Sequence, residues 1–205
     1  MILIGQLDSP FVRRVAVTMQ LYGMPYERRV LSVFADAAAV RDLNPLGKVP
    51  ALIADDGVAV FDSTFILDWL DERAGPVHAL TPRRGEARRD VQRLVAVALG
   101  VAEKSVERNG ETVRRPPGKQ VPELVDRIDA QITGALAWLE AEAAGEWLHG
   151  DALSQADVTL TAAVGHLGNR HPALWPDGSY PRLTAITVRC EALPAFRAAP
   201  FEDGG

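Results

Sequence analysis

The sequence is poor in cysteine and in long apolar runs, and each shortage excludes a class of protein. Cys190 is the one cysteine in 205 residues, so an internal disulfide and a cysteine-based zinc site are both excluded. The longest apolar run, residues 94–102, is less than half of the about twenty residues that a membrane-spanning helix needs. No basic stretch precedes the apolar start of the chain. We therefore expect no secretory signal, no membrane partner and a cytoplasmic protein.

Positive charge is also scarce. The chain has 22 basic and 27 acidic residues, which gives a net charge of −5, and neither half of it is basic. A nucleic-acid partner is therefore not expected, because phosphate backbones are bound by basic surfaces. The four histidines include no pair at helical i, i+4 spacing, and we expect no metal site.

The first eighty residues contain an ordered alternation of strand-like and helix-like patterns. Before the third helix, Asp55-Asp56-Gly57 separates two short strands and is typical of a hairpin. Gly75-Pro76 then ends the third helix. The predicted order is β-α-β-α-β-β-α, with strands at 2–7, 26–31, 51–54 and 58–61 and helices at 10–22, 34–43 and 64–74. This order predicts a small mixed sheet covered by helices.

After residue 76 the strand signals vanish. Ser154-Gln155-Ala156-Asp157 has the form of a capping box at the start of a helix. Residues 109–120 have the composition of a polar loop. Helices are predicted at about 83–106, 122–144, 155–167 and 181–192. We therefore predict an α+β protein with two domains, an α/β domain at 1–78 and an all-helical domain at 79–205.

Two serines stand where predicted helices begin. Helix N-termini present unpaired N–H groups and partial positive charge, which favour anions. Ser63 could bind a carboxylate through its hydroxyl and backbone N–H, and Asp62 beside it could receive an ammonium group. Ser9 could donate a hydrogen bond to a ligand thiolate and lower the pKa of that thiol. If the Val49–Pro50 bond is cis, the Val49 backbone could pair with an extended peptide.

Each of these residues also has a purely structural interpretation. Ser9 and Ser63 are good N-caps for the helices that follow them, and Pro50 suits an ordinary loop. Arg13 and Arg14 are expected to be solvated helix residues. Asp157 is expected to be structural, because a capping box needs no ligand.

Four motifs taken together resemble the cytosolic glutathione transferase superfamily. They are Ser-Pro-Phe-Val-Arg-Arg-Val at 9–15, Leu-Asn-Pro-Leu-Gly-Lys-Val-Pro-Ala-Leu at 43–52, Asp62-Ser63, and Gly-Asp-Ala-Leu-Ser-Gln-Ala-Asp at 150–157. Their order and separation match along essentially the whole chain, and the chain is most similar to serine-type bacterial members. The resemblance implies a thioredoxin-like N-terminal domain, an all-helical C-terminal domain and a homodimer.

The resemblance also implies roles for the binding residues. Val49, before a cis-Pro50, would bind the cysteinyl backbone of glutathione, and Ser63 with Asp62 would hold the γ-glutamyl end. Lys48 stands where some classes place a glutamine that touches glutathione. The usual acidic residue before the binding serine is glutamate, so Asp62 is one methylene shorter than the family pattern.

Ser9 resembles the serine that activates the thiol in serine-type classes. Classes with the similar Cys-Pro-Phe motif use a cysteine at this position. Because serine cannot form a mixed disulfide with glutathione, thiol-disulfide exchange is disfavoured here.

The predicted function is that of a glutathione transferase that uses glutathione as co-substrate and conjugates its thiolate to electrophilic, largely apolar small molecules. One alternative is a glutathione-dependent isomerase or dehalogenase, which would use the same thiolate. Another is a non-catalytic docking module with the same fold, although such a module need not keep Val49, Asp62 and Ser63.

Overall fold

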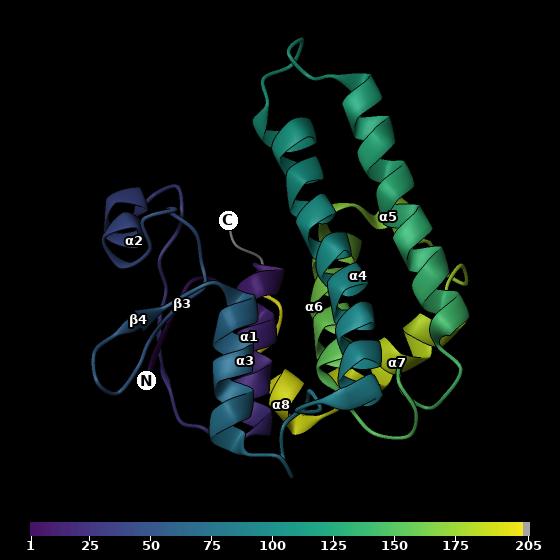
Figure 1. The fold of residues 1–205 in the computed structure, drawn as a ribbon. Helices are drawn as coiled ribbons and strands as arrows, with labels where there is room; N and C mark the ends of the chain where they lie inside the picture. Colours follow the sequence, from purple (N-terminus) through teal and green to yellow (C-terminus); the bar gives the residue numbers. More distant parts are fainter. Residues whose placement is uncertain (203–205) are drawn as a thin grey trace. The chain divides into compact units, whose positions relative to one another are not determined.

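The structure is a computed structural model that describes residues 1–202, and the chain divides into two compact units. One unit consists of Met1–Arg83 together with the residues from Glu191 onward, and the other consists of Arg84–Cys190. Figure 1 shows the sheet with its helices in the first unit and long helices in the second.

The sheet of the first unit has four short strands in the order β2-β1-β3-β4. Strand β1 pairs with β2 in parallel and with β3 antiparallel, and β3 pairs antiparallel with β4, which confirms the predicted hairpin. The strands are β1 (Ile2–Ile4), β2 (Glu27–Arg29), β3 (Ala51–Ile53) and β4 (Ala59–Val60). Leu3, Ile4 and Leu52 are fully buried, so the core lies along the two central strands.

Helices α1 (Pro10–Leu21) and α3 (Ser63–Ala74) pack against each other, and α1 also packs against β1. Figure 1 shows α2 (Ala37–Leu43) set apart from this pair. Helix α2 begins three residues later than predicted. The cause is a local turn in which the Ser32 hydroxyl accepts hydrogen bonds from the N–H groups of Phe34 and Ala35. The Asp36 carboxylate accepts another from the Ser32 N–H.

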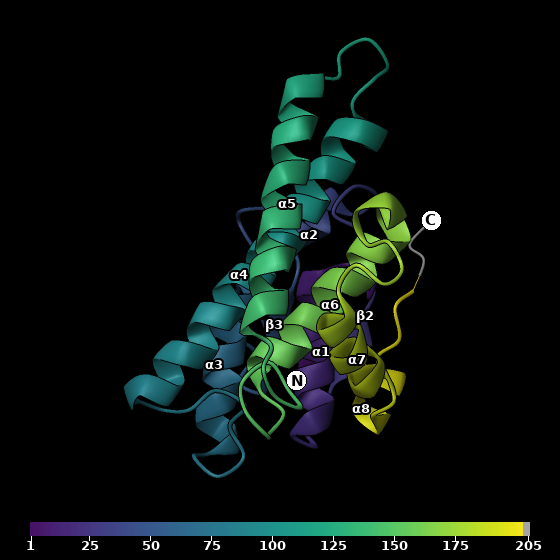
Figure 2. The same ribbon diagram turned by 90° about the vertical axis from the view of Figure 1, so that its right-hand side faces the viewer.

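The second unit is helical, and α6 (Gln155–Arg170) is its central element. It packs against α4 (Gly85–Asn109), which in turn packs against α5 (Pro122–Glu142), as Figure 2 shows. Nearly every residue of α6 from Gln155 to Leu167 is buried. The remaining elements are η1 (Gly110–Arg114), η2 (Pro172–Leu174) and α7 (Pro181–Glu191). Within residues 1–202, no helix has the length and apolarity needed to cross a membrane.

The predicted polar loop at 109–120 is wrong over its first part, where the chain stays helical. Helix α4 runs to Asn109 and continues into η1, a π-helical turn. The Thr112 hydroxyl donates to the Arg108 carbonyl at 2.9 Å, and the Gln120 side chain donates to the Thr112 carbonyl at 2.8 Å. These side chains satisfy backbone groups at the end of the helix, which the polar composition of the segment concealed.

Arg13 is not the solvated residue that the sequence predicted. Its guanidinium is buried, makes a two-pronged ion pair with Glu191 at 2.8 and 2.7 Å, and donates through Nε to the Ala199 carbonyl at 3.0 Å. Helix α8 (Pro194–Arg197) also packs against α1. Residues 191–202 therefore pack with the first unit, whereas the sequence-based division placed all of 79–205 in a second domain.

Candidate functional site

The first turn of α1 presents the Ser9 hydroxyl. Ser9 adopts an extended conformation as the N-cap, and its Oγ accepts from the Val12 N–H at 3.4 Å, a long hydrogen bond. Pro10 opens the helix, as predicted. Ser9 is half-buried, and its own hydroxyl hydrogen meets no acceptor within residues 1–202. The cap interpretation is thus correct, and it leaves the hydroxyl able to donate to a ligand.

The Val49–Pro50 peptide bond is cis, which confirms the expectation. Asn44, buried at the C-terminus of α2, braces the loop before it by donating to the Lys48 carbonyl at 2.9 Å and accepting from the Leu46 N–H at 3.0 Å. In the described part of the chain, no hydrogen bond reaches the Val49 N–H or C=O. This backbone therefore keeps a donor and an acceptor for an extended partner.

Gly5, a residue that the sequence analysis did not single out, joins these two segments. It follows β1 with a positive φ of 127° and is buried. A Cβ atom built on it would lie 2.6 Å from Cγ2 of Val12 and 3.0 Å from Cβ of Val49. The first turn of α1 and the cis-proline loop therefore approach each other over a position where only glycine fits.

The start of α3 differs from the prediction in one respect, because its N-cap is Asp62 and Ser63 is already helical. Oδ1 of Asp62 accepts from the N–H groups of Thr64 at 2.8 Å and Phe65 at 3.2 Å. Asp62 is exposed, and no residue from 1 to 202 donates to its other oxygen, Oδ2. The Phe61–Asp62 peptide bond is also cis.

Arg14 links α1 to the start of α3. It was expected to be solvated, but it is only 1% exposed. Its Nε donates to Oγ of Ser63 at 3.2 Å, and its Nη2 donates to Oγ1 of Thr64 at 2.9 Å. The helix-start serine of α3 is thereby held against α1, one turn beyond Ser9.

These contacts bring most of the predicted site residues to one region of the first unit. The starts of α1 and α3 supply hydroxyl donors, N–H groups and partial positive charge, while Val49 and Asp62 supply unpaired acceptors. Lys48 is the exception, since its side chain is exposed and forms no hydrogen bond or ion pair within the described residues. The region can bind an anion, an ammonium group and an extended backbone together.

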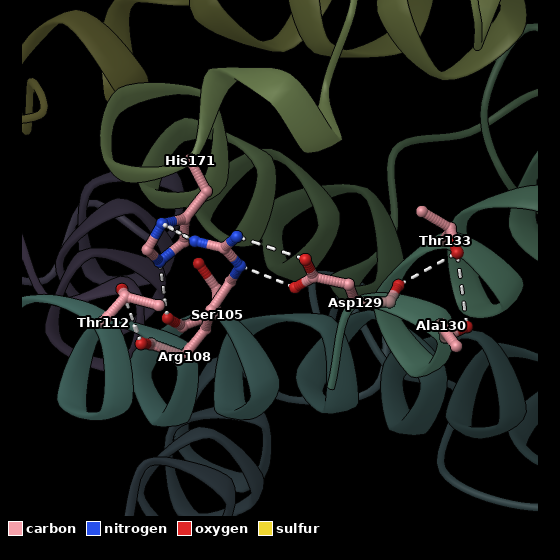
Figure 3. Close-up of polar contacts among 7 residues, drawn as sticks. All are labelled: Ser105, Arg108, Thr112, Asp129, Ala130, Thr133 and His171. Carbon is pink, nitrogen blue, oxygen red and sulfur yellow. Dashed lines mark hydrogen bonds and ion pairs between the residues drawn. The ribbon is translucent and has the colours of Figure 1, made fainter. Parts of the chain in front are cut away.

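A second polar cluster lies inside the helical unit. The Arg108 guanidinium is paired with Asp129 at 2.6 and 3.1 Å and donates to Nδ1 of His171 at 3.1 Å, as Figure 3 shows. Because Nδ1 accepts, Nε2 carries the proton and donates to the Ser105 carbonyl at 3.0 Å. The Ser105 hydroxyl is bonded to His166 at 2.8 Å.

The serine and the histidines of this cluster are residue types found in nucleophilic catalytic sites, but a substrate has no access to the serine hydroxyl. Ser105 is fully buried and its hydroxyl is already bonded to His166, so no substrate can reach that hydroxyl. Burial lowers the pKa of His166 to about 4, with smaller contributions from His171 and Arg170, so the ring is neutral at pH 7. Within residues 1–202, no three His, Cys, Asp or Glu side chains are grouped so as to hold a metal ion.

Asp157 forms the capping box that the sequence predicted. Its carboxylate accepts from the Leu148 N–H, the Ser154 N–H and the Ser154 hydroxyl, each at 2.8 Å. Burial raises the pKa of Asp157, and these hydrogen bonds oppose the shift. The residue joins the loop before α6 to the helix itself, which is a structural role.

Two stretches of the chain match models of known protein families. Residues 3–78 match the family model "Glutathione S-transferase, N-terminal domain", and residues 122–198 match "Glutathione S-transferase, C-terminal domain". A protein of Vibrio cholerae serotype O1 named "Probable maleylacetoacetate isomerase" is 30% identical over 98% of this chain and 95% of its own. The chain belongs to the glutathione S-transferase family.

Other members of the glutathione S-transferase family match over most of their length. The "Uncharacterized GST-like protein YibF" of Escherichia coli (strain K12) is 29% identical over 83% of this chain and 84% of its own. The crystal structure of a glutathione transferase family member from Pseudomonas fluorescens Pf-5, with bound glutathione, is 35% identical and superimposes with a TM-score of 0.87 over 97% of each chain. The predicted fold, a thioredoxin-like domain followed by a helical one, is confirmed.

Proposed function

We propose that the protein is a glutathione transferase that binds glutathione on residues 1–78 and conjugates its thiolate to electrophilic, largely apolar small molecules. The observation that carries the proposal is the junction in the first unit, where the start of α1, the cis-proline loop and the start of α3 are held together by Gly5 and Arg14. The glutathione bound to the Pseudomonas fluorescens relative supports the choice of ligand.

The γ-glutamyl and cysteinyl parts of glutathione would each have a complementary group in this region. The α-carboxylate of the γ-glutamyl end would accept from the Ser63 hydroxyl and the α3 N-terminus, and its ammonium would donate to Oδ2 of Asp62. The cysteinyl backbone would pair with the free N–H and C=O of Val49, before the cis-Pro50. Lys48, exposed at the edge of the loop, would contact the ligand from solvent.

Ser9 would act on the thiol. A free thiol with a pKa near 8.5 is about 3% thiolate at pH 7, and lowering that pKa to about 7 raises the fraction to about half. The Ser9 hydroxyl would donate to the thiolate, and the α1 N-terminus would add partial positive charge. With chlorodinitrobenzene, the thiol proton leaves to water, the sulfur forms a bond to the ring carbon, and chloride departs with the electron pair of the broken C–Cl bond.

Two variants of Ser9 separate its catalytic role from its role as a cap. Ser9→Asp keeps a good N-cap but replaces the donor with an anion, whereas Ser9→Ala removes both. We expect both variants to raise the pKa of bound glutathione in an ultraviolet difference titration and to slow conjugation by about tenfold to hundredfold. If Ser9→Asp conjugates at the rate of the unchanged protein, Ser9 is a cap alone.

A glutathione-dependent isomerase is the second candidate. It is favoured by relatives whose names are maleylacetoacetate isomerase, including the one from Vibrio cholerae. The stoichiometry distinguishes the two reactions, because an isomerase regenerates glutathione and a transferase consumes it. Isomerisation of maleylacetoacetate with no loss of free thiol would favour the isomerase, and halide release from haloalkanes with no net loss of free thiol would identify a dehalogenase.

A docking module with this fold need not bind glutathione, whereas both enzymes must. Retention on immobilised glutathione and elution by the free tripeptide therefore test both enzyme functions together, and a protein that passes straight through the column excludes them. We further propose a cytoplasmic homodimer in which the helices from about residue 83 to 120 hold the second substrate. Light scattering behind size-exclusion chromatography measures the mass of the assembly.

A further inference from the structure

Two consecutive arginines on α1 are buried, and they do different things. Arg13 is paired with a carboxylate, Glu191, whereas the hydrogen bonds of Arg14 include two to the neutral hydroxyls of Ser63 and Thr64. Both arginines are 2% exposed or less. Burying a guanidinium without hydrogen-bond acceptors would cost free energy. The acceptors around each arginine therefore fix the orientation of its planar group.

The contact with Arg14 limits what the Ser63 hydroxyl can do. A guanidinium only donates, so Oγ of Ser63 must be the acceptor in the 3.2 Å bond with Nε. A serine hydroxyl has one hydrogen, and within residues 1–202 no acceptor is bonded to it. That hydrogen is therefore directed away from Arg14 and is available to an incoming acceptor. Ser63 is 4% exposed, so water competes weakly for the same bond.

The second bond of Arg14 fixes the guanidinium itself. Nη2 donates to Oγ1 of Thr64 at 2.9 Å, so one planar group spans the first two residues of α3. Asp62 caps the same turn through its carboxylate. The first turn of α3, which would receive the carboxylate, therefore has the Ser63 hydroxyl as a donor of fixed direction. The Arg14 guanidinium is one hydrogen bond away from that carboxylate's donor.

We propose that Arg14 is a positioning residue for substrate binding, whose guanidinium holds the Ser63 hydroxyl as a donor toward the α-carboxylate of the γ-glutamyl group of glutathione. The proposal rests on the proposed function, because it assigns that carboxylate to Ser63. Arg14 does not touch the ligand. It acts through the direction of one hydroxyl.

Calorimetric titration with two ligands tests the proposal. The ligands are glutathione and 4-aminobutyryl-cysteinylglycine, which lacks only the α-carboxylate. We expect Arg14→Met to raise the Kd for glutathione about tenfold and to change the Kd for the analogue by less than threefold. Arg13→Met is the matched control, because it removes an equally buried guanidinium from the neighbouring position, and it should leave the ratio of the two Kd values unchanged.

Two further variants keep the test decisive if Arg14→Met does not fold. Arg14→Lys retains the charge but cannot donate to Ser63 and Thr64 in the same planar geometry, and it should raise the KM for glutathione with little change in kcat, since the thiol is activated at Ser9. In the Ser63→Ala background, either Arg14 variant should have almost no additional effect on the glutathione Kd.

Three outcomes would overturn the proposal. An equal loss of affinity for both ligands, or losses that add with that of Ser63→Ala, would make Arg14 a structural residue only, while glutathione binding by the unchanged protein still supported the proposed function. Failure of the unchanged protein to bind glutathione would refute the function and the role of Arg14 together.

Discussion

Two sets of polar side chains, one in each unit, differ in whether their hydrogen-bonding groups are all used. In the helical unit, Asp157 accepts three hydrogen bonds, and the pair Ser105 and His166 is sealed from solvent. In the first unit, the hydroxyls of Ser9 and Ser63 each accept one bond and keep a hydrogen that no described residue receives. The Ser105 hydroxyl is therefore closed to a ligand, whereas Ser9 and Ser63 keep a donor for one. For these three serines, the hydrogen bonds left unmade, more than the residue type, distinguish a hydroxyl that can bind a ligand.

The largest effect is expected at Gly5, where the first turn of α1 and the cis-proline loop meet. Gly5→Ala forces a side chain into a positive φ of 127° and into contact with Val12 at 2.6 Å, and it should lower the free energy of unfolding by about 4 kcal/mol. Glutathione affinity should fall with it, because Val49 is displaced. Urea unfolding and calorimetric titration measure the two losses.

Gly57→Ala is the control for Gly5→Ala. Gly57 also has a positive φ, of 85°, but a Cβ there would meet nothing within 4 Å. It should cost only about 1 to 2 kcal/mol of backbone strain and leave glutathione affinity unchanged. Equal losses for the two variants would mean that the close approach of Val12 and Val49 has no importance.

In the helical unit we expect a smaller effect, which is limited to a loss of stability. Asp157→Ala removes the acceptor of three buried hydrogen bonds and leaves their donors unpaired, so the free energy of unfolding should fall by about 3 kcal/mol. The glutathione Kd of the folded fraction should stay the same. Asp151→Ala, at an exposed position a few residues earlier, should change neither quantity. A weaker glutathione Kd in Asp157→Ala would break the distinction between the units.

The smallest of these effects is a dependence of stability on pH. Burial lowers the pKa of His166 from its ordinary 6.5 to about 4, so between these values the unfolded chain binds a proton that the folded chain excludes. This neutral histidine therefore contributes stability above pH 6.5, and about 2 to 3 kcal/mol of it is lost as the pH falls toward 4. His166→Asn, which does not titrate, should show a shallower decline in unfolding free energy over this range. Identical slopes would contradict the assignment.

Local sequence signals were enough to predict most of the helices and strands. The caps at Ser9 and Ser154, the glycine after α3 and the hairpin around Asp55-Asp56-Gly57 each depend on neighbouring residues, and all were found as predicted. The cis bond before Pro50 was expected from the family resemblance and is confirmed.

The missed features depend on partners that are distant in sequence. Arg14 lies 49 residues from Ser63, so α1 alone gives no sign that its charge is buried. Gly5 has no unusual neighbours, and its importance arises only where Val12 and Val49 converge on it. The capping of α3 by Asp62 in place of Ser63 was missed for a different reason, because adjacent residues of similar capping ability cannot be ranked without the backbone.

The ion pair between Arg13 and Glu191 also has a consequence for synthesis of the protein on the ribosome. Arg13 is made 178 residues before its partner, and the helix that carries it belongs to a unit whose last segment begins at Glu191. While the chain is growing, that guanidinium has no carboxylate to neutralise it, and burying it alone would cost several kcal/mol. The first unit, although residues 1–83 are translated first, can reach its final packing only after the helical unit has been made.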